Sequence, residues 1–255
     1  MSQNHSFTFN GVNSANFGVT ITNVKNTVIP HWEGSYTPIP GRNGDFYTPS
    51  NRMSNVEVTY SCAIKENFVE NYNGLINALM AFGTAPGYSE LRDSVFPGIF
   101  RMAILDKQQK VTLLPNAIAG RFDLVFSCMP QRFLDSGKEM IRAISGMTAT
   151  FTNPGMESMP YIWIHMSGAS TGNLVPQDGM FRIDNAVIEV TQVTGQIVLD
   201  CETQNAYQEV GGQIISMNEH VRLDEFPRLA PGEHTVKRLT DSIDIINIMP
   251  RWWIV

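Results

Sequence analysis

The chain of 255 residues is long enough to form one large domain or two of ordinary size, each with a buried core. Its formal net charge is −6 and no basic run interrupts it, which argues against a nucleic-acid binder, because such proteins neutralise phosphates with Lys and Arg. No apolar run reaches the roughly eighteen residues of a membrane-spanning helix. We therefore expect neither specific nucleic-acid binding nor a membrane contact.

Charged residues make up only 16% of the chain, against about 25% in an average domain. Asparagine and glycine replace part of the missing charge. A surface with so few charges fits a protein that covers much of it with neighbouring subunits. It fits an Asn-rich soluble protein equally well, so composition leaves both interpretations open.

The N-terminal part contains two turn-forming segments between extended runs. Phe7, Phe9 and Val12 flank Asn10–Gly11, a dipeptide that readily takes the positive φ angles of a tight β-turn. A second turn consists of Gly41, Arg42, Asn43, Gly44 and Asp45. A strand is expected at 56–64, where one face carries Val56, Val58, Tyr60, Cys62 and Ile64.

One segment of the first half predicts an α-helix, at residues 67–82. Asn67 is the expected N-cap, Glu70 completes a capping box, and Gly83 ends the helix. Gly74 in its middle suggests a close approach by a strand. The apolar face of this helix is expected to carry Phe68, Tyr72, Leu75, Ile76, Leu79 and Met80.

The remaining pattern predicts strands on either side of a domain boundary near residue 140. In the first domain, 1–140, strands are expected at 99–105, 111–114 and 122–133, with a polar turn at 106–109. A sheet with one helix makes this domain α+β. The second domain, 145–255, shows no persuasive helix and predicts a β-sandwich. Its expected strands are 161–166, 181–183, 187–190, 197–201, 213–217, 243–248 and 252–255.

A search for catalytic chemistry returns little, and we predict no catalytic, cofactor-binding or metal-binding residue and no enzyme activity. His165 alternates with apolar residues in a strand and has no triad partners nearby, so a structural histidine is favoured. Glu219–His220 and Glu233–His234 place acids beside imidazoles, but adjacent residues in a strand or loop point apart.

The cysteines and most of the tryptophans are interpreted as buried residues of the core. The three cysteines, Cys62, Cys128 and Cys201, are odd in number and scattered, which predicts buried free thiols.

Tryptophan rings stack on sugars in many binding sites, so a platform for a polysaccharide is a second hypothesis for the tryptophans, beside burial in the core. Its candidates are Trp163, Trp252 and Trp253, although burial in the core explains most of them better.

The order and spacing of the turns and strands resemble one known family, the distal tail proteins of long-tailed siphophages. The N-terminal domain carries Phe7-Thr8-Phe9-Asn10-Gly11, Phe17-Gly18-Val19, Pro40-Gly41-Arg42-Asn43-Gly44 and the strand ending near Cys62. The resemblance continues with the strand Phe122–Phe133, Asn153-Pro154-Gly155, Pro160-Tyr161-Ile162-Trp163-Ile164 and Phe226–Gly232. It covers most of the chain and implies a mainly β protein in which a galectin-like β-sandwich follows the α+β domain.

The resemblance implies a structural virion protein assembled in the host cytoplasm and located at the tail tip. A homo-hexameric ring would connect the tail tube protein to the tail-associated baseplate or tip protein, and its second domains would hold receptor-binding proteins. Gly41 to Asp45 would belong to the contacts between copies, and Glu57, Glu66 and Asp45 are candidates to face the lumen. Two alternatives remain, a carbohydrate-binding receptor-recognition module and a tail-tube or tube-terminator subunit.

Overall fold

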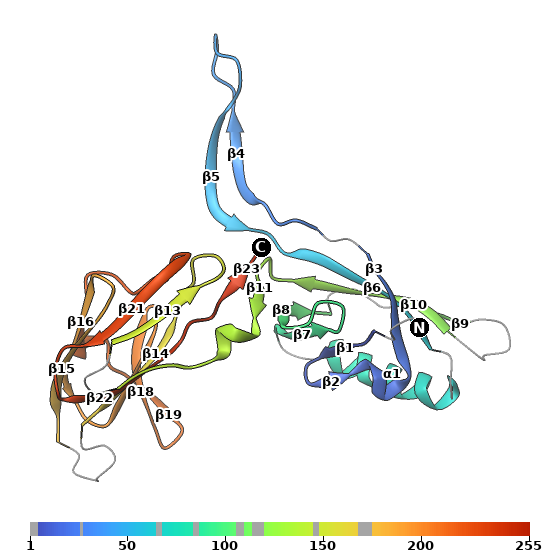
Figure 1. Ribbon diagram of the computed structural model, residues 1–255. Helices are drawn as coiled ribbons and strands as arrows, with labels where there is room; N and C mark the ends of the chain where they lie inside the picture. Colours follow the sequence, from blue (N-terminus) through green and yellow to red (C-terminus); the bar gives the residue numbers. More distant parts are fainter. Residues whose placement is uncertain are drawn as a thin grey trace. The chain divides into compact units, whose positions relative to one another are not determined.

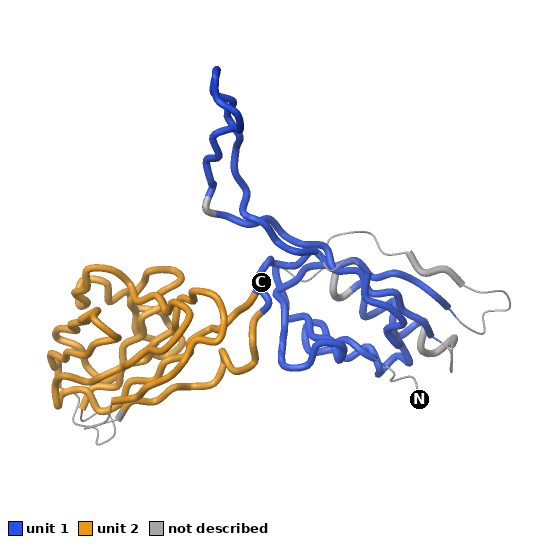
Figure 2. The backbone as a smooth tube through the Cα atoms, turned by 45° about the horizontal axis from the view of Figure 1, so that its top comes forward, with its two compact units in different colours: residues 1–132, 255 blue, residues 133–254 orange. Residues whose placement is uncertain are grey.

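The computed structural model divides the chain into two compact units, residues 1–132 with 255, and residues 133–254 (Figure 2). The structure describes residues 5–25, 28–64, 68–83, 87–105, 110–113, 120–144, 148–167 and 175–255. The expected cap Asn67, the lumen candidate Glu66 and the turn 106–109 lie outside the described residues. The two units divide after Arg132, whereas the sequence predicts a domain boundary near residue 140. Independent folding of the two parts stays a prediction.

The first unit combines an antiparallel sheet, one α-helix among its described residues and a separate hairpin (Figure 1). Neighbouring strands of the main sheet follow the order β2-β1-β7-β8-β10-β6-β3, and β9 pairs with the first half of β10. The elements are β1 (Phe7–Phe9), β2 (Val12–Asn13), η1 (Ser14–Phe17), β3 (Val19–Lys25), β4 (Trp32–Thr37), β5 (Phe46–Met53), β6 (Val56–Ile64), α1 (Phe68–Gly83), β7 (Ser89–Asp93), β8 (Ile99–Ile104), β9 (Lys110–Leu113) and β10 (Gly120–Cys128). A further short strand, β11 (Arg132–Leu134), spans the division between the units.

The predicted turn at Asn10–Gly11 closes the first hairpin. Asn10 and Gly11 have φ angles of 48° and 78°, and Phe9 faces Val12 across the β1–β2 pair. Two successive positive φ angles match the twist of the flanking strands. The side chains of Phe7 and Phe9 then enter the core, where they are 2% and 1% exposed.

The core of the first unit is built on the paired strands β6 and β10. The predicted buried face of β6 is confirmed, with exposures of 6% or less at Val56, Val58, Tyr60, Cys62 and Ile64. From β10, the ring of Phe126 lies 5.1 Å from that of Phe9 and 5.9 Å from that of Tyr60, centroid to centroid. The Tyr60 hydroxyl donates to Asp93 at 2.7 Å, which satisfies the polar end of this buried side chain.

The predicted helix is confirmed as α1, and two details differ from expectation. Leu75 and Leu79 reach the core, but Met80 is 66% exposed, so the apolar face is narrower than its pattern suggests. A Cβ on Gly74 would lie 2.9 Å from the ring of Phe17. The close neighbour of Gly74 is therefore an aromatic side chain of η1, and the expected approach of a strand was wrong.

The expected strand 122–133 is interrupted. β10 ends at Cys128, and β11 begins only at Arg132. The interval contains Pro130, which has no backbone N–H to donate to a ladder. The strands expected at 99–105 and 111–114 correspond to β8 and β9. β8 ends one residue earlier than expected, and residue 114 lies outside the described residues.

The second unit is a β-sandwich of two antiparallel sheets. One sheet has the order β12-β22-β14-β17-β18-β19 and the other β13-β21-β15-β16-β20. The core between them takes fully buried residues from both, such as Ile162 and Ile164 from β14 and Phe181 from β15. The elements are η3 (Asp135–Lys138), β12 (Ile141–Ile144), β13 (Thr148–Asn153), β14 (Tyr161–Met166), β15 (Gln177–Ile183), β16 (Ala186–Val193), β17 (Gln196–Asp200), β18 (Asn205–Val210), β19 (Gln213–Ser216), η4 (Asn218–His220), β20 (Val221–Arg222), β21 (Gly232–Arg238), β22 (Ile243–Met249) and β23 (Trp253–Ile254).

Six of the seven strands expected in the second domain correspond to strands of the sandwich, with ends shifted by a few residues. The seventh, 252–255, corresponds to β23, which pairs with β11 and belongs to neither sheet of the sandwich. The sequence analysis missed β12, β13, β18, β20 and β21. β13 has the sequence Thr-Ala-Thr-Phe-Thr-Asn, and every residue of it pairs with β21. Its polar–apolar alternation includes only one large apolar residue, Phe151, so the signal is weak although Thr and Phe favour strands.

Candidate assembly surface

A two-stranded hairpin, residues 28–53 and called the arm below, pairs with no other strand of the described chain. Its strands β4 and β5 face each other through pairs such as Tyr36–Tyr47 and Thr37–Phe46. In Figures 1 and 2 the hairpin stands clear of the main sheet of its own unit. An isolated two-stranded ribbon is marginally stable in water, so this element is expected to gain much of its stability from a partner.

The predicted turn forms the tip of the arm. Gly41 and Gly44 have φ angles of 79° and 83°, a conformation that glycine adopts without strain. The amide of Arg42 donates to the carbonyl of Ile39 at 3.2 Å, which closes the bend. Arg42, Asn43 and Asp45 are exposed there. Their part in assembly stays a prediction.

The arm exposes large aromatic side chains to solvent. Trp32 is 53% exposed, Tyr36 70%, Phe46 54% and Tyr47 37%. No residue of the arm belongs to the buried core of its unit. Exposed apolar side chains gathered on one element of a soluble protein often mark an interaction site.

Side-chain contacts hold the arm in a defined shape. The rings of Tyr36 and Tyr47 lie 5.0 Å apart, and the Tyr47 hydroxyl donates to the carbonyl of Trp32 at 3.0 Å. Near the base, Arg52 contacts Glu33 at 3.3 Å. A shaped hairpin loses less conformational entropy on binding than a flexible loop does. These contacts join the two strands of the arm to each other.

Sequence reasoning identified the turn at the tip and missed the aromatic residues that flank it. Trp32, Tyr36, Phe46 and Tyr47 lie within a short stretch rich in Pro and Gly, without the alternation typical of a half-buried strand. Aromatic residues in a segment that predicts no buried face are the signal that was available.

The structure separates the three tryptophans proposed as a sugar platform. Trp252 is 4% exposed and packs in the core of the second unit, so it is not accessible to a ligand. Trp253 is partly exposed, and its indole nitrogen donates to the carbonyl of Glu157 at 2.9 Å. Trp163 is partly exposed on β14, with its ring centroid 4.2 Å from that of Tyr161. Sugar stacking stays a prediction for Trp163 and Trp253.

The histidines of the second unit have structural partners. His165 Nε2 lies 3.2 Å from the side-chain nitrogen of Asn247, and desolvation, followed by the charge of Arg142, lowers the pKa of His165. His234 is buried, and its two ring nitrogens lie 2.7 Å from Asp184 Oδ2 and 2.6 Å from the carbonyl of Ala230. The His165 contact joins β14 and β22 of one sheet, and the His234 contacts join β21 to neighbouring turns of the other sheet, which is a structural role.

One expectation about adjacent acids and histidines was wrong. Glu233 is exposed while His234 is buried, so that pair does point apart along β21. Glu219 and His220 instead lie in the 3₁₀ helix η4, where a carboxylate oxygen is 3.7 Å from His220 Nε2. Adjacent side chains point apart in an extended backbone, whereas a helical turn brings them closer. His220 Nδ1 also lies 2.8 Å from the carbonyl of Thr191.

All three cysteines are free and buried, as predicted. Burial raises the pKa of Cys62, Cys128 and Cys201 to about 12 each. The thiolate is the reactive form, so we expect no rapid reaction of the native protein with a disulfide reagent at pH near 8. In guanidinium chloride all three thiols should react at once. Stoichiometric labelling of a thiol within the first minute under native conditions would contradict this assignment.

The described residues contain no group of three His, Cys, Asp or Glu side chains arranged to hold a metal ion. In the same part of the chain, no helix has both the length and the apolar character needed to span a membrane.

Comparison with known proteins gives a result only at the level of structure. No protein-family model matches the sequence, and a search of curated proteins finds no match. The crystal structure of the phage SPP1 Dit protein, described as a paradigm of the hub adsorption apparatus in phages that infect Gram-positive bacteria, matches with a TM-score of 0.69 and 12% identity, covering 96% of this chain and 98% of that one. The chain has the Dit fold.

Two further structures extend the comparison to an assembled particle. They show the phage P2 baseplate in its activated conformation, with Ca and with Sr, and match with TM-scores of 0.52 and 0.51 at 9% and 10% identity. They cover 97% and 96% of this chain and 98% and 97% of theirs. The predicted mainly β architecture with one helix is confirmed, and so is the resemblance to distal tail proteins at the level of the fold.

Proposed function

We propose that this protein is a structural component of a siphophage virion, a hexameric ring at the distal end of the tail that connects the tail tube to the tip or baseplate. The observation that carries the proposal is the exposed aromatic arm on a chain with the Dit fold. The solved structures that match this chain are a hub protein and two baseplates. No catalytic activity or cofactor is part of this proposal.

A hairpin that stands clear of its own sheet (Figure 1) suits a contact with the next copy of a ring. Arm residues of one copy would contact a different surface of the next copy, a heterologous contact that closes into a ring when the rotation fits. The apolar side chains Trp32, Tyr36 and Phe46 would then lose their solvent exposure. Aromatic anchors of this kind dominate the energetics of many interfaces.

The other partners follow from the same proposal. The tail tube protein and the tail-associated baseplate or tip protein would contact the two faces of the ring, and the second unit would anchor receptor-binding proteins. The location would be the virion tail tip, after assembly in the host cytoplasm. Asp45 and Glu57 remain candidates for the lumen, where negative charge disfavours retention of DNA.

The second candidate function, carbohydrate recognition by the sandwich, is favoured by one observation. Tyr161 and Trp163 form a partly exposed aromatic pair, and the Arg251 guanidinium lies 5.1 Å from the centre of the Tyr161 ring. Aromatic faces beside hydrogen-bonding groups suit sugars, but Arg251 also contacts Asp200 and Glu202, which favours a structural role.

The ring is tested by light scattering on the purified chain at increasing micromolar concentrations, with negative-stain images of the same samples. We expect a mass that rises toward the hexamer and particles with six-fold symmetry. A monomer at all concentrations, also in the presence of the tail tube protein or the tip protein, contradicts the hub proposal.

A further inference from the structure

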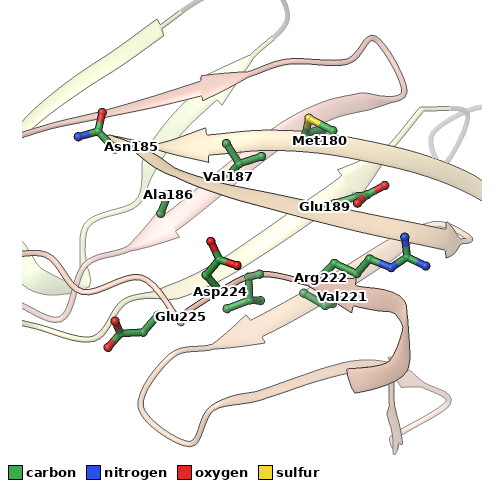
Figure 3. Close-up of a pocket in the computed structure, with 10 residues that line it drawn as sticks. Met180, Asn185, Ala186, Val187, Glu189, Val221, Arg222, Asp224 and Glu225 are labelled. Carbon is green, nitrogen blue, oxygen red and sulfur yellow. The ribbon is translucent and has the colours of Figure 1, made fainter.

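The second unit contains a groove between strand β16 and the segment that follows β20 (Figure 3). The groove has a volume of about 630 Å³, and a neighbouring hollow of about 430 Å³ continues it along residues 221–225. Apolar side chains of Met180, Val187, Val221 and Leu223 line the main groove. Val187 is 48% exposed, which is high for a valine within a strand.

One wall of the groove is a sheet edge that is only partly paired. β16 pairs with β15 along nearly its whole length, but it pairs with β20 only at Glu189 and Val190. Among the described residues, no strand occupies that side of Ala186–Ile188. Alternate N–H and C=O groups of a strand point to each side. This stretch therefore offers free backbone groups to an added strand.

Carboxylates surround the same space. Glu189, Asp224 and Glu225 line the groove, and Figure 3 shows the Asp224 carboxylate directed toward β16. Asp224 is exposed and forms no ion pair within the described residues. Glu225 lies 3.3 Å from Arg228, so part of its charge is already compensated. Arg222 also lines the groove and stands opposite Glu189 in the β16–β20 pair, so Asp224 is the carboxylate without a basic neighbour among these lining residues. The groove thus combines an apolar floor, an open sheet edge and a net negative charge, because three carboxylates face one guanidinium.

We propose that this groove binds an extended, basic segment of a partner protein, which pairs with Ala186–Ile188 as an additional strand. Alternate side chains of the segment would pack on Val187 and Leu223, and a Lys or Arg would lie beside Asp224 and Glu189. Strand addition gives affinity through the backbone and specificity through alternate side chains. A nucleic acid does not fit, because its phosphates would face the carboxylates. The inference does not depend on ring formation.

The probe is a fluorescein-labelled ten-residue peptide of alternating valine and lysine, titrated with the full-length protein and followed by anisotropy. We expect saturable binding. Asp224→Lys should weaken it about fivefold, because a reversed surface charge changes such a contact by up to about 1 kcal/mol. The matched control is Glu209→Lys, an exposed acid of the same unit that lies outside the groove and has no ion pair in the described chain.

Two control peptides separate strand addition from charge attraction. A peptide of alternating valine and glutamate should not bind. The valine–lysine peptide with every backbone amide methylated keeps its charge but has no N–H left to pair with a sheet edge, and it should also fail to bind. Equal weakening by Asp224→Lys and Glu209→Lys, binding of the methylated peptide, or no binding at all would each overturn the proposal. Circular dichroism of both variants confirms that they are folded.

Discussion

Replacing three aromatic residues of the arm should abolish association between copies while leaving each copy folded. The variant combines Trp32→Thr, Tyr36→Thr and Phe46→Thr, since threonine maintains β propensity. These side chains are 53%, 70% and 54% exposed, so their loss removes little from the core. At an interface, an aromatic anchor contributes about 2 kcal/mol or more, which corresponds to roughly thirtyfold in the dissociation constant.

The measurement is light scattering at concentrations where the unmodified chain associates, together with thermal unfolding. A matched control variant removes three exposed apolar residues elsewhere: Phe96→Ser, Ile214→Ser and Leu239→Ser, which are 42%, 72% and 42% exposed. We expect the control to associate normally. Association of the arm variant at the same concentration as the unmodified chain would show that the arm is not the interface.

Removing Phe126 from the core of the first unit should destabilise that unit and leave the second unaffected. Phe126 is fully buried and its ring contacts those of Phe7, Phe9 and Tyr60. Truncation of a buried Phe to Ala costs about 3–5 kcal/mol, a large part of the stability of a small domain. The midpoint of the first unit's unfolding should therefore fall sharply in Phe126→Ala.

Two signals distinguish the units during guanidinium unfolding. The helical circular dichroism follows α1 in the first unit, whereas tryptophan fluorescence follows mainly Trp163, Trp252 and Trp253 in the second. The reciprocal variant is Phe181→Ala, a fully buried residue of the sandwich core, which should shift only the fluorescence transition. If both signals shift together in both variants, the two units unfold as one and the predicted domain independence is wrong.

The elements that were predicted correctly share one property: their local sequence pattern is compatible with only one secondary structure. The alternation over Val56–Ile64 places five apolar side chains on one face in any sheet, and Asn10–Gly11 has one kind of turn. The helix pattern led to α1 for the same reason. The polar strand Thr148–Asn153 escaped recognition because its alternation carries only one large apolar residue, Phe151, and its pairing with β21 is visible only in the structure.

The candidate sites depended on tertiary structure to a greater degree. Trp252 and Trp253 are adjacent in sequence, and only packing decides that the first enters the core while the second is partly exposed. The groove beside Val187 requires that β20 pair with two residues of β16 and then leave its edge. Such partial pairing joins segments more than thirty residues apart, so no local sequence pattern predicts it.

The sequence by itself determined the β-rich architecture, the position of the helix, the tip turn at Gly41–Asp45 and the burial of the cysteines, since each follows from local periodicity or backbone preference. Tertiary structure decided which apolar residues remain on the surface. Trp32, Tyr36 and Phe46 are as hydrophobic as the aromatic residues of the core, yet β4 and β5 find no third strand and no covering layer among the described residues. Exposure is a property of the whole packing arrangement, and the proposal that the arm binds a partner rests on it.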